Sequence, residues 1–323
     1  MGSRYLLNKI VQAIGTVFFI IVLNFVLFRM MPGSPDRVLL RNPNVTAEIR
    51  EAARERWGLD QPMPVQLVRY IGATLQGDLG YSFKYQGLPV TEVLAGRLWP
   101  TLILFGLGEL IAIVFGLALG AYSGWKRGGR VDYIGNGTSL IIYSMPYFVI
   151  GMFMLGIFAT GLGWFPTNGM FEIGRQYDTA WEQVADFAWH LVLPVLTVAI
   201  GLIGQYSILM RSSVIDTLGE DYVTTARAKG LTDGKVLRAH ALPNALLPAV
   251  TLIAINLGFV IGGAITVEVV FNWPGLGTLT VDAVAARDYP VLQGIFLLLS
   301  ISVVAANLLA DIIYGRLDPR VRA

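Results

Sequence analysis

The chain has 323 residues, of which 54% are hydrophobic and only 14% are charged, and its formal net charge is +2. Soluble proteins carry about 25% charged residues, so this composition excludes an ordinary soluble enzyme, a disordered chain and a nucleic-acid-binding protein. Cysteine is absent, which excludes disulfides and thiolate metal sites, and neither His190 nor His240 belongs to an H-E-x-x-H pattern. We therefore expect a multi-span membrane protein with no catalytic residue, no metal site and no cofactor of its own.

Six segments are long and apolar enough to cross a bilayer, because a spanning helix needs about 20 mostly apolar residues. The fourth segment is interrupted by Pro194. We expect the first segment to be a span and not a cleaved signal peptide, because its apolar run is long and no A-x-A site follows it. The expected fold is all-α and polytopic. The six predicted spans are Ile10–Met31, Leu98–Tyr122, Ile134–Thr160, His190–Met210, Ala245–Val270 and Pro290–Tyr314.

Lysine and arginine residues indicate the orientation, because they are enriched in short cytoplasmic connections. The two short loops on the expected outer side carry only Arg175 and Arg287. We therefore expect both termini to be cytoplasmic, which agrees with an even number of spans. The basic residues on the expected cytoplasmic side are Arg4, Lys9, Lys126, Arg127, Arg130, Arg211, Arg227, Lys229, Lys235, Arg238, Arg316, Arg320 and Arg322.

A segment between the first two spans, roughly Pro32 to Arg97, is too patterned to be a simple connector. It contains VTAEIREAARERWGL, whose apolar residues recur at helical spacing, and GDLGYSF at Gly77–Phe83. We expect a small folded external cap. The expected domains are residues 1–96 for the first span and cap, 97–315 for the transmembrane core, and 316–323 for a cytoplasmic tail.

A second patterned segment, Arg211 to Asn244, separates the fourth and fifth spans. Asp221–Lys229 is predicted to be a short helix with Tyr222, Val223 and Ala226 on one face. Gly230 stands where a left-handed residue ends a helix, Thr232 is expected to cap a second helix, and Pro243 is expected to break it. Composition alone would also fit a solvated amphipathic loop.

This second segment resembles the cytoplasmic motif of permease subunits from binding-protein-dependent ABC importers. That motif reads Glu-Ala-Ala, three residues, Gly, nine residues, Ile, one residue, Leu-Pro. Here Thr224-Thr225-Ala226, Gly230 and Leu242-Pro243 occupy the matching positions, while Thr224 replaces the acid and His240 replaces Ile. TARAKGL at Thr225–Leu231 and HALPNALLP at His240–Pro248 resemble the dipeptide/oligopeptide permease subfamily.

Further stretches that resemble this subfamily extend over nearly the whole chain. They are GLDQP at Gly58–Pro62, GDLGYS at Gly77–Ser82, SMPYFVIG at Ser144–Gly151, VEVVFNWPGLG at Val267–Gly277, RDYPVLQG at Arg287–Gly294 and LDPRVR at Leu317–Arg322.

The resemblance implies a permease in a bacterial or archaeal inner membrane. It implies a similar second permease subunit, two cytoplasmic ATPase subunits that bind ATP and Mg²⁺, an extracytoplasmic substrate-binding protein and a peptide cargo. The chain has no phosphate loop of its own, because GLTDGKV at Gly230–Val236 has the wrong glycine spacing and lacks Ser or Thr after its Lys.

The resemblance also implies site residues, which we group by expected role. Coupling to the ATPase is expected from Asp221, Tyr222, Thr224, Thr225, Ala226, Arg227, Ala228, Lys229, Gly230, Leu231, Leu242 and Pro243. The translocation path or its gate is expected to involve Asn256, Gly258, Gly262, Gly263 and Glu268. Contact with the binding protein is expected from Asn272, Trp273, Pro274, Gly275, Leu276 and Gly277.

Several alternatives stay open at this point. Glu109, inside the second span, could relay protons or bind a substrate amine, but an interior hydrogen bond would also explain it. Glu268 could touch cargo or order the NWPGLG turn. Nickel or glutathione could replace peptides as cargo. An ion-gradient-driven transporter is the alternative class, although the chain has no convincing internal repeat, and an intramembrane enzyme lacks the residues it would need.

Overall fold

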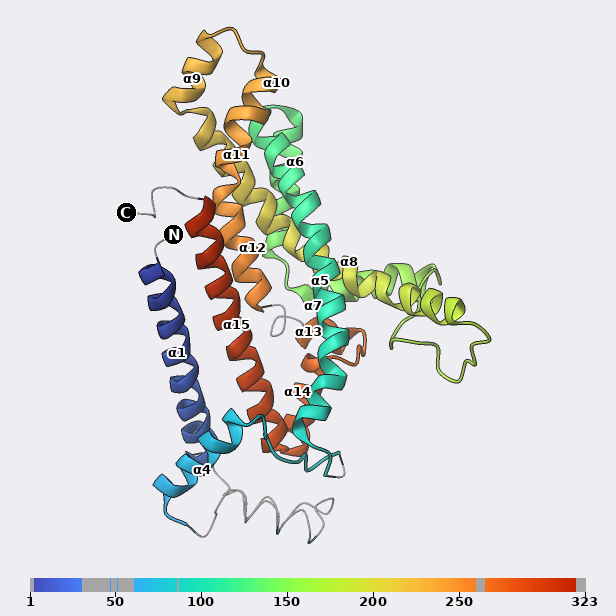
Figure 1. Ribbon diagram of the computed structural model, residues 1–323. Helices are drawn as coiled ribbons and strands as arrows, with labels where there is room; N and C mark the ends of the chain where they lie inside the picture. Colours follow the sequence, from blue (N-terminus) through green and yellow to red (C-terminus); the bar gives the residue numbers. More distant parts are fainter. Residues whose placement is uncertain are drawn as a thin grey trace. The chain divides into compact units, whose positions relative to one another are not determined.

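The fold is all-helical in the computed structural model, which describes residues 3–30, 47, 51, 61–85, 87–259 and 265–317 (Figure 1). The described residues also contain an isolated antiparallel bridge between Tyr81 and Pro89. The helices are α1 Ser3–Met30, α4 Met63–Leu75, α5 Val90–Trp125, α6 Arg130–Ser144, α7 Tyr147–Met154, the π-helix η1 Leu155–Gly161, α8 Ala180–Leu218, α9 Asp221–Ala228, α10 Asp233–Val236, the π-helix η2 Leu237–Ala241, α11 Leu242–Ala245, α12 Leu247–Phe259, α13 Ile265–Val270, α14 Leu276–Ala286 and α15 Tyr289–Leu317.

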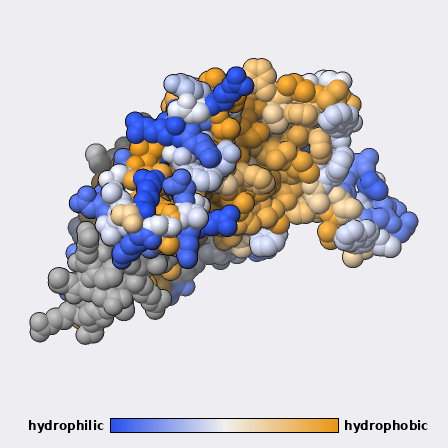
Figure 2. All heavy atoms as spheres, turned by 90° about the horizontal axis from the view of Figure 1, so that it is seen from above, coloured by the Kyte–Doolittle hydropathy of each residue, from blue (hydrophilic) through white to orange (hydrophobic). Residues whose placement is uncertain are grey.

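Four helices, α1, α5, α8 and α15, are each long and apolar enough to cross a membrane. Two bent helix pairs pass the same test together, so the described residues provide four to six spans. Many large apolar side chains on these helices are exposed. The face seen in Figure 2 carries a broad apolar expanse. An expanse of this kind suits contact with lipid more than contact with water.

The third predicted span, Ile134–Thr160, is not one continuous helix. The structure breaks it after Ser144, and the direction changes by 103° between Arg130–Ser144 and Tyr147–Gly161. The residue before a proline is pushed out of the helical region by the proline ring. Met145, which precedes Pro146, accordingly has φ −86° and ψ 130°. The predicted third segment therefore consists of two helices that pass the length and apolarity test together, and the sharp bend between them was not predicted from the sequence.

The fourth and fifth predicted spans also differ from expectation. α8 runs without a break through Pro194, so the predicted interruption is wrong; membrane helices tolerate proline where neighbouring groups satisfy the freed backbone. The fifth span corresponds to α12 and α13, with a 44° bend between Asp233–Ala245 and Leu247–Gly258. Gly262 and Gly263 lie outside the described residues.

The chain forms two compact units. Unit 1 comprises Met1–Leu102, Gly258–Ile265 and Pro274–Ala323, and unit 2 comprises Ile103–Leu257 and Thr266–Trp273. In unit 1, α1 packs along α15, and α14 packs against the start of α15. The apolar core of unit 1 consists of Val90, Leu94, Leu276, Leu279, Ala283, Val291, Leu292 and Ile295.

A loop in unit 1 is fixed by two acidic residues, Asp288 just before α15 and Asp282 of α14. The Asp288 carboxylate is fully buried and accepts hydrogen bonds from Ser82 Oγ (2.5 Å) and from the Phe83 and Lys84 amides (3.0 Å each). Lys84 Nζ also forms an ion pair with Asp282 at 2.9 Å. Burial lowers the pKa of Lys84, but its hydrogen bonds and charge interactions with Asp282 and Tyr85 outweigh this effect and raise the pKa overall.

This loop joins two of the sequence motifs, GDLGYSF and RDYPVLQG, in one buried contact. It is also part of the segment predicted to form an external cap. The other predicted element there, the helix over VTAEIREAARERWGL, lies almost entirely outside the described residues. Its existence therefore stays a prediction.

In unit 2, α5 and α8 pack with their backbones close together. Gly116, Gly120 and Gly124 recur every fourth residue of α5, on the face that meets α8. A Cβ atom added at Gly120 would lie 2.3 Å from the Ser207 carbonyl oxygen, and one at Gly124 would lie 2.8 Å from the Arg211 carbonyl oxygen. Only glycine permits this approach, which is the packing expected of small residues at spacing four in membrane helices.

Candidate functional site: the coupling segment and a buried polar cluster

The predicted short helix before Gly230 is confirmed as α9, Asp221–Ala228, with Lys229 at its C-terminal end. Gly230 has φ +82°, so the predicted left-handed turn is also confirmed. An L-residue reaches this region only at a cost, which explains glycine here. Beyond the turn, α10 begins at Asp233 as expected, but the Thr232 side chain makes no capping hydrogen bond.

The inner face of α9 packs against its own neighbours. Val223 and Ala226 are buried and form an apolar cluster with Val236 of α10, against which Leu218 of α8 and Leu231 also pack. α9 and α10 are thus packed onto the end of the long helix α8. Tyr222, which was predicted to share this face, is 41% exposed, and its hydroxyl accepts a hydrogen bond from Asn244 Nδ2 at 3.0 Å.

The outer face of α9 has no packing partner within the described part of the chain. Small and polar side chains cover it, with Arg227 in an ion pair to Asp233 at 3.6 Å. Figure 1 shows α9 and α10 projecting together from one end of unit 2. The exposed residues of α9 and of the turn that ends it are Asp221, Tyr222, Thr224, Thr225, Arg227, Ala228, Lys229 and Gly230.

Pro243 does not break the helix where the sequence predicted. The chain remains helical from Asp233 to Ala245, but the stretch before Pro243 widens into the π-helix η2, Leu237–Ala241. Proline has no N–H to donate and its ring clashes with the carbonyl four residues earlier, and a local widening relieves both problems. The bend falls instead at Leu246, between α11 and α12.

A second apolar cluster joins η2 and α11 to the long helices of unit 2. Met210 and Val214 of α8 pack with Leu237, Ala241 and Ala245. Leu117 and Ala121 of α5 and the partly buried Leu242 pack against the same cluster. The segment that follows α9 and α10 is therefore joined to both α8 and α5 by apolar contacts.

A buried polar cluster links three helices of unit 2. The Tyr206 hydroxyl on α8 donates to Glu109 Oε1 on α5, and Asn256 Nδ2 on α12 donates to the Tyr206 oxygen at 3.0 Å. Glu109 is 2% exposed and Tyr206 is fully buried. The interior hydrogen bond that was one interpretation of Glu109 is therefore present, and its carboxyl group is occupied by a tyrosine.

Sequence reasoning missed Tyr206 as the partner of Glu109. Asn256, predicted to line the path, is the third member of this cluster. Gly258, predicted in the same group, lies against α15, since a Cβ there would sit 3.0 Å from the Ala306 Cβ. Glu268 is fully buried and its backbone oxygen accepts from the Trp273 amide at 2.7 Å.

The NWPGLG turn is mostly buried within this chain. Trp273 is fully buried and its ring lies 5.8 Å from that of Phe187, and Leu276 is 1% exposed. Gly275 and Gly277 are buried as well. Asn272, which has φ +47°, is exposed and Pro274 is half-buried, so these two residues are the accessible part of the turn.

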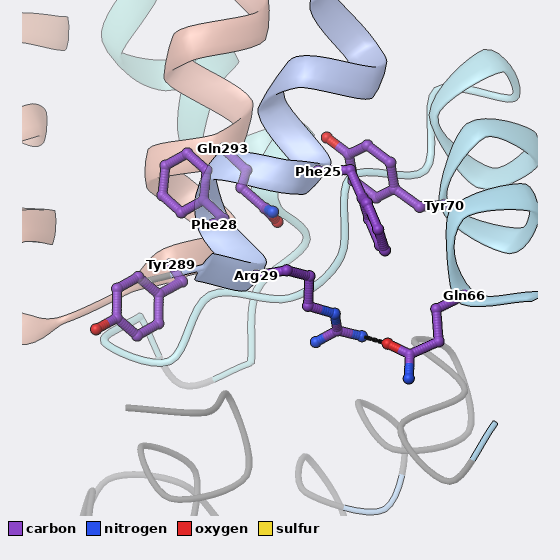
Figure 3. A pocket seen from close by; sticks show the side chains of 7 residues that line it. All are labelled: Phe25, Phe28, Arg29, Gln66, Tyr70, Tyr289 and Gln293. Carbon is purple, nitrogen blue, oxygen red and sulfur yellow. Dashed lines mark hydrogen bonds between the residues drawn. The ribbon is translucent and has the colours of Figure 1, made fainter. Parts of the chain in front are cut away.

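A small pocket in unit 1 offers no acid–base chemistry. It lies between α1, α4 and α15, and Figure 3 shows aromatic rings around the Arg29 side chain, which donates to Gln66 Oε1. The lining contains no carboxylate. Among the described residues, no three metal-ligating side chains gather anywhere. The pocket is lined by Phe25, Phe28, Arg29, Gln66, Tyr70, Tyr289 and Gln293.

Comparisons with known proteins show which family the chain belongs to. Residues 112–323 match the family described as binding-protein-dependent transport system inner membrane component, and residues 2–104 match the N-terminal region of such components. A peptide permease protein of Brucella suis is 39% identical over 321 residues, covering 99% of each chain. The glutathione transport system permease protein GsiC of Salmonella paratyphi A is 39% identical over 319 residues, again covering 99% of each chain.

A solved structure shares the fold. The MetNI methionine ABC transporter in an inward-facing conformation matches 70% of this chain and 96% of its own, with a TM-score of 0.56 and 20% identity. Taken with the exposed α9 segment and the apolar helices, these matches identify the chain as a multi-pass inner-membrane permease subunit of a binding-protein-dependent ABC importer, in which it is not itself the ATPase.

Proposed function

We propose that this permease imports peptides, with glutathione, itself a tripeptide, within its chemical range. Both relatives cover essentially the whole chain, and their names give peptide and glutathione as cargo. Nickel, the other cargo considered from the sequence, finds no support in those names. The permease is expected to share its path with a second permease subunit and to receive cargo from a substrate-binding protein.

We infer that α9 seats on a cytoplasmic ATPase subunit, and that Asp221–Leu231 with Leu242 and Pro243 transmit its movement. The single observation that carries this proposal is that α9 has an exposed outer face and an inner face packed onto α8 through Val223, Ala226 and Leu218. Small residues such as Thr225 and Ala228 allow close approach to a partner. ATP binding and Mg²⁺ belong to that partner.

The same proposal places both termini and α9 in the cytoplasm. Its support is the distribution of basic residues, since the connection that contains α9 and the connection at Lys126–Arg130 are rich in Lys and Arg. The binding protein would then meet the opposite side, where Asn272 and Pro274 are accessible. The segment around Gly77–Phe83 lies on that side in this orientation.

The absence of cysteine makes the coupling proposal directly testable. A Thr225→Cys variant in the assembled transporter should cross-link to the ATPase subunit, because Thr225 is exposed on the outer face of α9. The matched control is Ile173→Cys, since Ile173 is 94% exposed in the loop before α8 and should not cross-link to the ATPase. Equal cross-linking of both variants, or none from Thr225→Cys, would refute the docking of α9.

Cargo requires a separate measurement. Cells that lack their own peptide and glutathione uptake should accumulate labelled dipeptides, oligopeptides or glutathione when they express this chain with its partner subunits. The uptake should stop when ATP is depleted and persist when the proton gradient alone is collapsed. Uptake that follows the ion gradient would instead support the secondary-transporter alternative, and uptake of nickel without peptide would replace the peptide assignment.

A further inference from the structure

A polar pocket in unit 2 is lined by residues that have no part in the proposed coupling segment, path or binding-protein contact. It opens at the start of α6 and has a volume of about 360 Å³. Figure 1 shows the start of α6 at the end of unit 2 from which α9 and α10 project. Its lining residues are Arg127, Gly128, Asp132, Tyr133, Asn136, Gly137 and Arg211.

The one acid in the pocket is already neutralised. Arg211 donates to both oxygens of Asp132, from Nε to Oδ1 at 2.5 Å and from Nη2 to Oδ2 at 2.9 Å, and the Gly128 amide donates to Oδ2 at 2.9 Å. These bonds leave the Nη1 group of Arg211 for another acceptor. Arg127 adds a second cation, so the pocket as a whole carries a positive charge that suits an anion.

An apolar surface continues directly from this pocket along α6. Leu140 and Ile141 lie one helical turn beyond Asn136 and Gly137, and they are 50% and 64% exposed. Ile134, also on α6, is 69% exposed. A ligand that fills both regions must combine an anionic group with a long apolar chain. The apolar chain must be able to lie along the exposed surface of a membrane helix.

We propose that this pocket binds the phosphate headgroup of an anionic phospholipid, from the leaflet nearest the coupling segment, with an acyl chain along Leu140 and Ile141. Arg127 and the Nη1 group of Arg211 contact the phosphate, and Asn136 supplies a further polar group. Basic pockets beside membrane helices recognise anionic lipids by this combination of charge and apolar contact. This proposal goes beyond the proposed function, because the lipid site depends neither on the cargo nor on the direction of import.

The test uses the assembled transporter in nanodiscs, followed by mild delipidation and native mass spectrometry. Arg127→Gln should lower the retained phosphatidylglycerol roughly fivefold, which is the weight of one basic residue near an anionic surface. Arg130→Gln is the matched control, because it removes the same charge from the same connection but lies outside the pocket. Equal loss in both variants would show a general surface charge effect and overturn the site.

A second variant blocks the site without removing charge. A Cβ atom at Gly137 would meet nothing within 4 Å, so Gly137→Leu should fold and place its side chain in the pocket. It should also release phosphatidylglycerol, with the thermal unfolding midpoint in lipid-free detergent unchanged. Full retention of the lipid in this variant would place the binding elsewhere and refute the proposal.

Two further arms distinguish the source of the anion. Phosphatidylcholine should be retained less than phosphatidylglycerol, and millimolar inorganic phosphate should fail to displace the lipid, because it lacks the acyl chain. Equal retention of both lipids would remove the role of charge, and displacement by phosphate would assign the pocket to a soluble anion. Cross-linking at Thr225 and cargo uptake test the proposed function separately. Failure of the proposed function would therefore not be mistaken for failure of the lipid site.

Discussion

In unit 2, helix α8 makes two contacts of different kinds, one through backbone packing and one through a side-chain hydrogen bond. α5 meets α8 through glycines, with backbone against backbone, over Gly116, Gly120 and Gly124. α12 meets α8 through a side-chain hydrogen bond, from Asn256 to Tyr206. Close backbone packing leaves little room for small shifts, whereas a single hydrogen bond can be exchanged for another one. We therefore expect α5 and α8 to stay together in any rearrangement of unit 2, and α12 to separate from α8 more readily.

The largest expected effect comes from breaking the glycine contact. Gly120→Leu should prevent α5 from approaching α8, because a Cβ there would already lie 2.3 Å from the Ser207 oxygen. We expect overpacking to cost about 1–3 kcal/mol or more, and therefore a marked loss of folded protein. The measurement is the thermal unfolding midpoint in detergent.

The control for this prediction lies on the same helix. A Cβ at Gly106 would meet nothing within 4 Å, so Gly106→Leu should leave the midpoint nearly unchanged. Leucine also has a higher helix propensity than glycine, which favours the variant slightly. If both variants lowered the midpoint equally, the close contact between α5 and α8 would not be what stabilises this unit.

A smaller effect is expected from breaking the polar link. Tyr206→Phe removes the hydroxyl that donates to Glu109 and accepts from Asn256, and leaves a buried carboxyl group without that donor. The loss should be about 1–3 kcal/mol of folding free energy. We expect binding-protein-stimulated ATP hydrolysis to change more than basal hydrolysis, because the link between α12 and α8 is altered.

The single substitution Glu109→Gln sharpens this test, since glutamine keeps an oxygen that can accept from Tyr206. It should retain most of the stimulation that Tyr206→Phe loses. Basal and stimulated hydrolysis could instead fall in parallel, in proportion to the amount of folded transporter. This result would show that the polar link only stabilises unit 2, and that the contacts of α12 and α5 with α8 do not differ in function.

The smallest effect on stability is expected at the end of α9. Gly230 has φ +82°, and a Cβ atom added there would meet nothing within 4 Å. A side chain at this position therefore meets backbone strain alone, about 1–2 kcal/mol for an L-residue. Gly230→Val should reduce stimulated ATP hydrolysis and uptake more than it reduces folding. Gly230→Asn is the matched control, because asparagine tolerates the left-handed region, and it should retain coupling.

The coupling segment was largely predictable from the sequence, whereas the core contacts were not. The position of α9, the turn at Gly230 and the start of α10 follow from local propensity and turn chemistry, which depend on neighbouring residues. The pairing of Glu109 with Tyr206 depends on how α5 and α8 align, and no local pattern contains that information. The glycines at spacing four did offer a signal for the contact between α5 and α8.

Prolines were the main source of error for the same reason. Pro194 and Pro243 were expected to interrupt their helices, and no effect of Pro146 was predicted. The outcome at a proline depends on its surroundings. Pro146 accompanies a 103° change of direction, Pro194 stays within a continuous helix, and Pro243 follows a widened π-helix. Contacts with neighbouring helices determine which of these conformations has the lowest free energy, and those helices are distant in the sequence.

The make-up of unit 1 has a consequence for biosynthesis. α1 is made well before α15, but it packs on α15, and its Asn24 donates to the Gln293 carbonyl 269 positions later. The Ser82–Lys84 loop likewise cannot form its hydrogen bonds until Asp288 has been made. During translation, α1 must therefore wait for its native neighbour, and unit 1 can close only after α15 has left the ribosome.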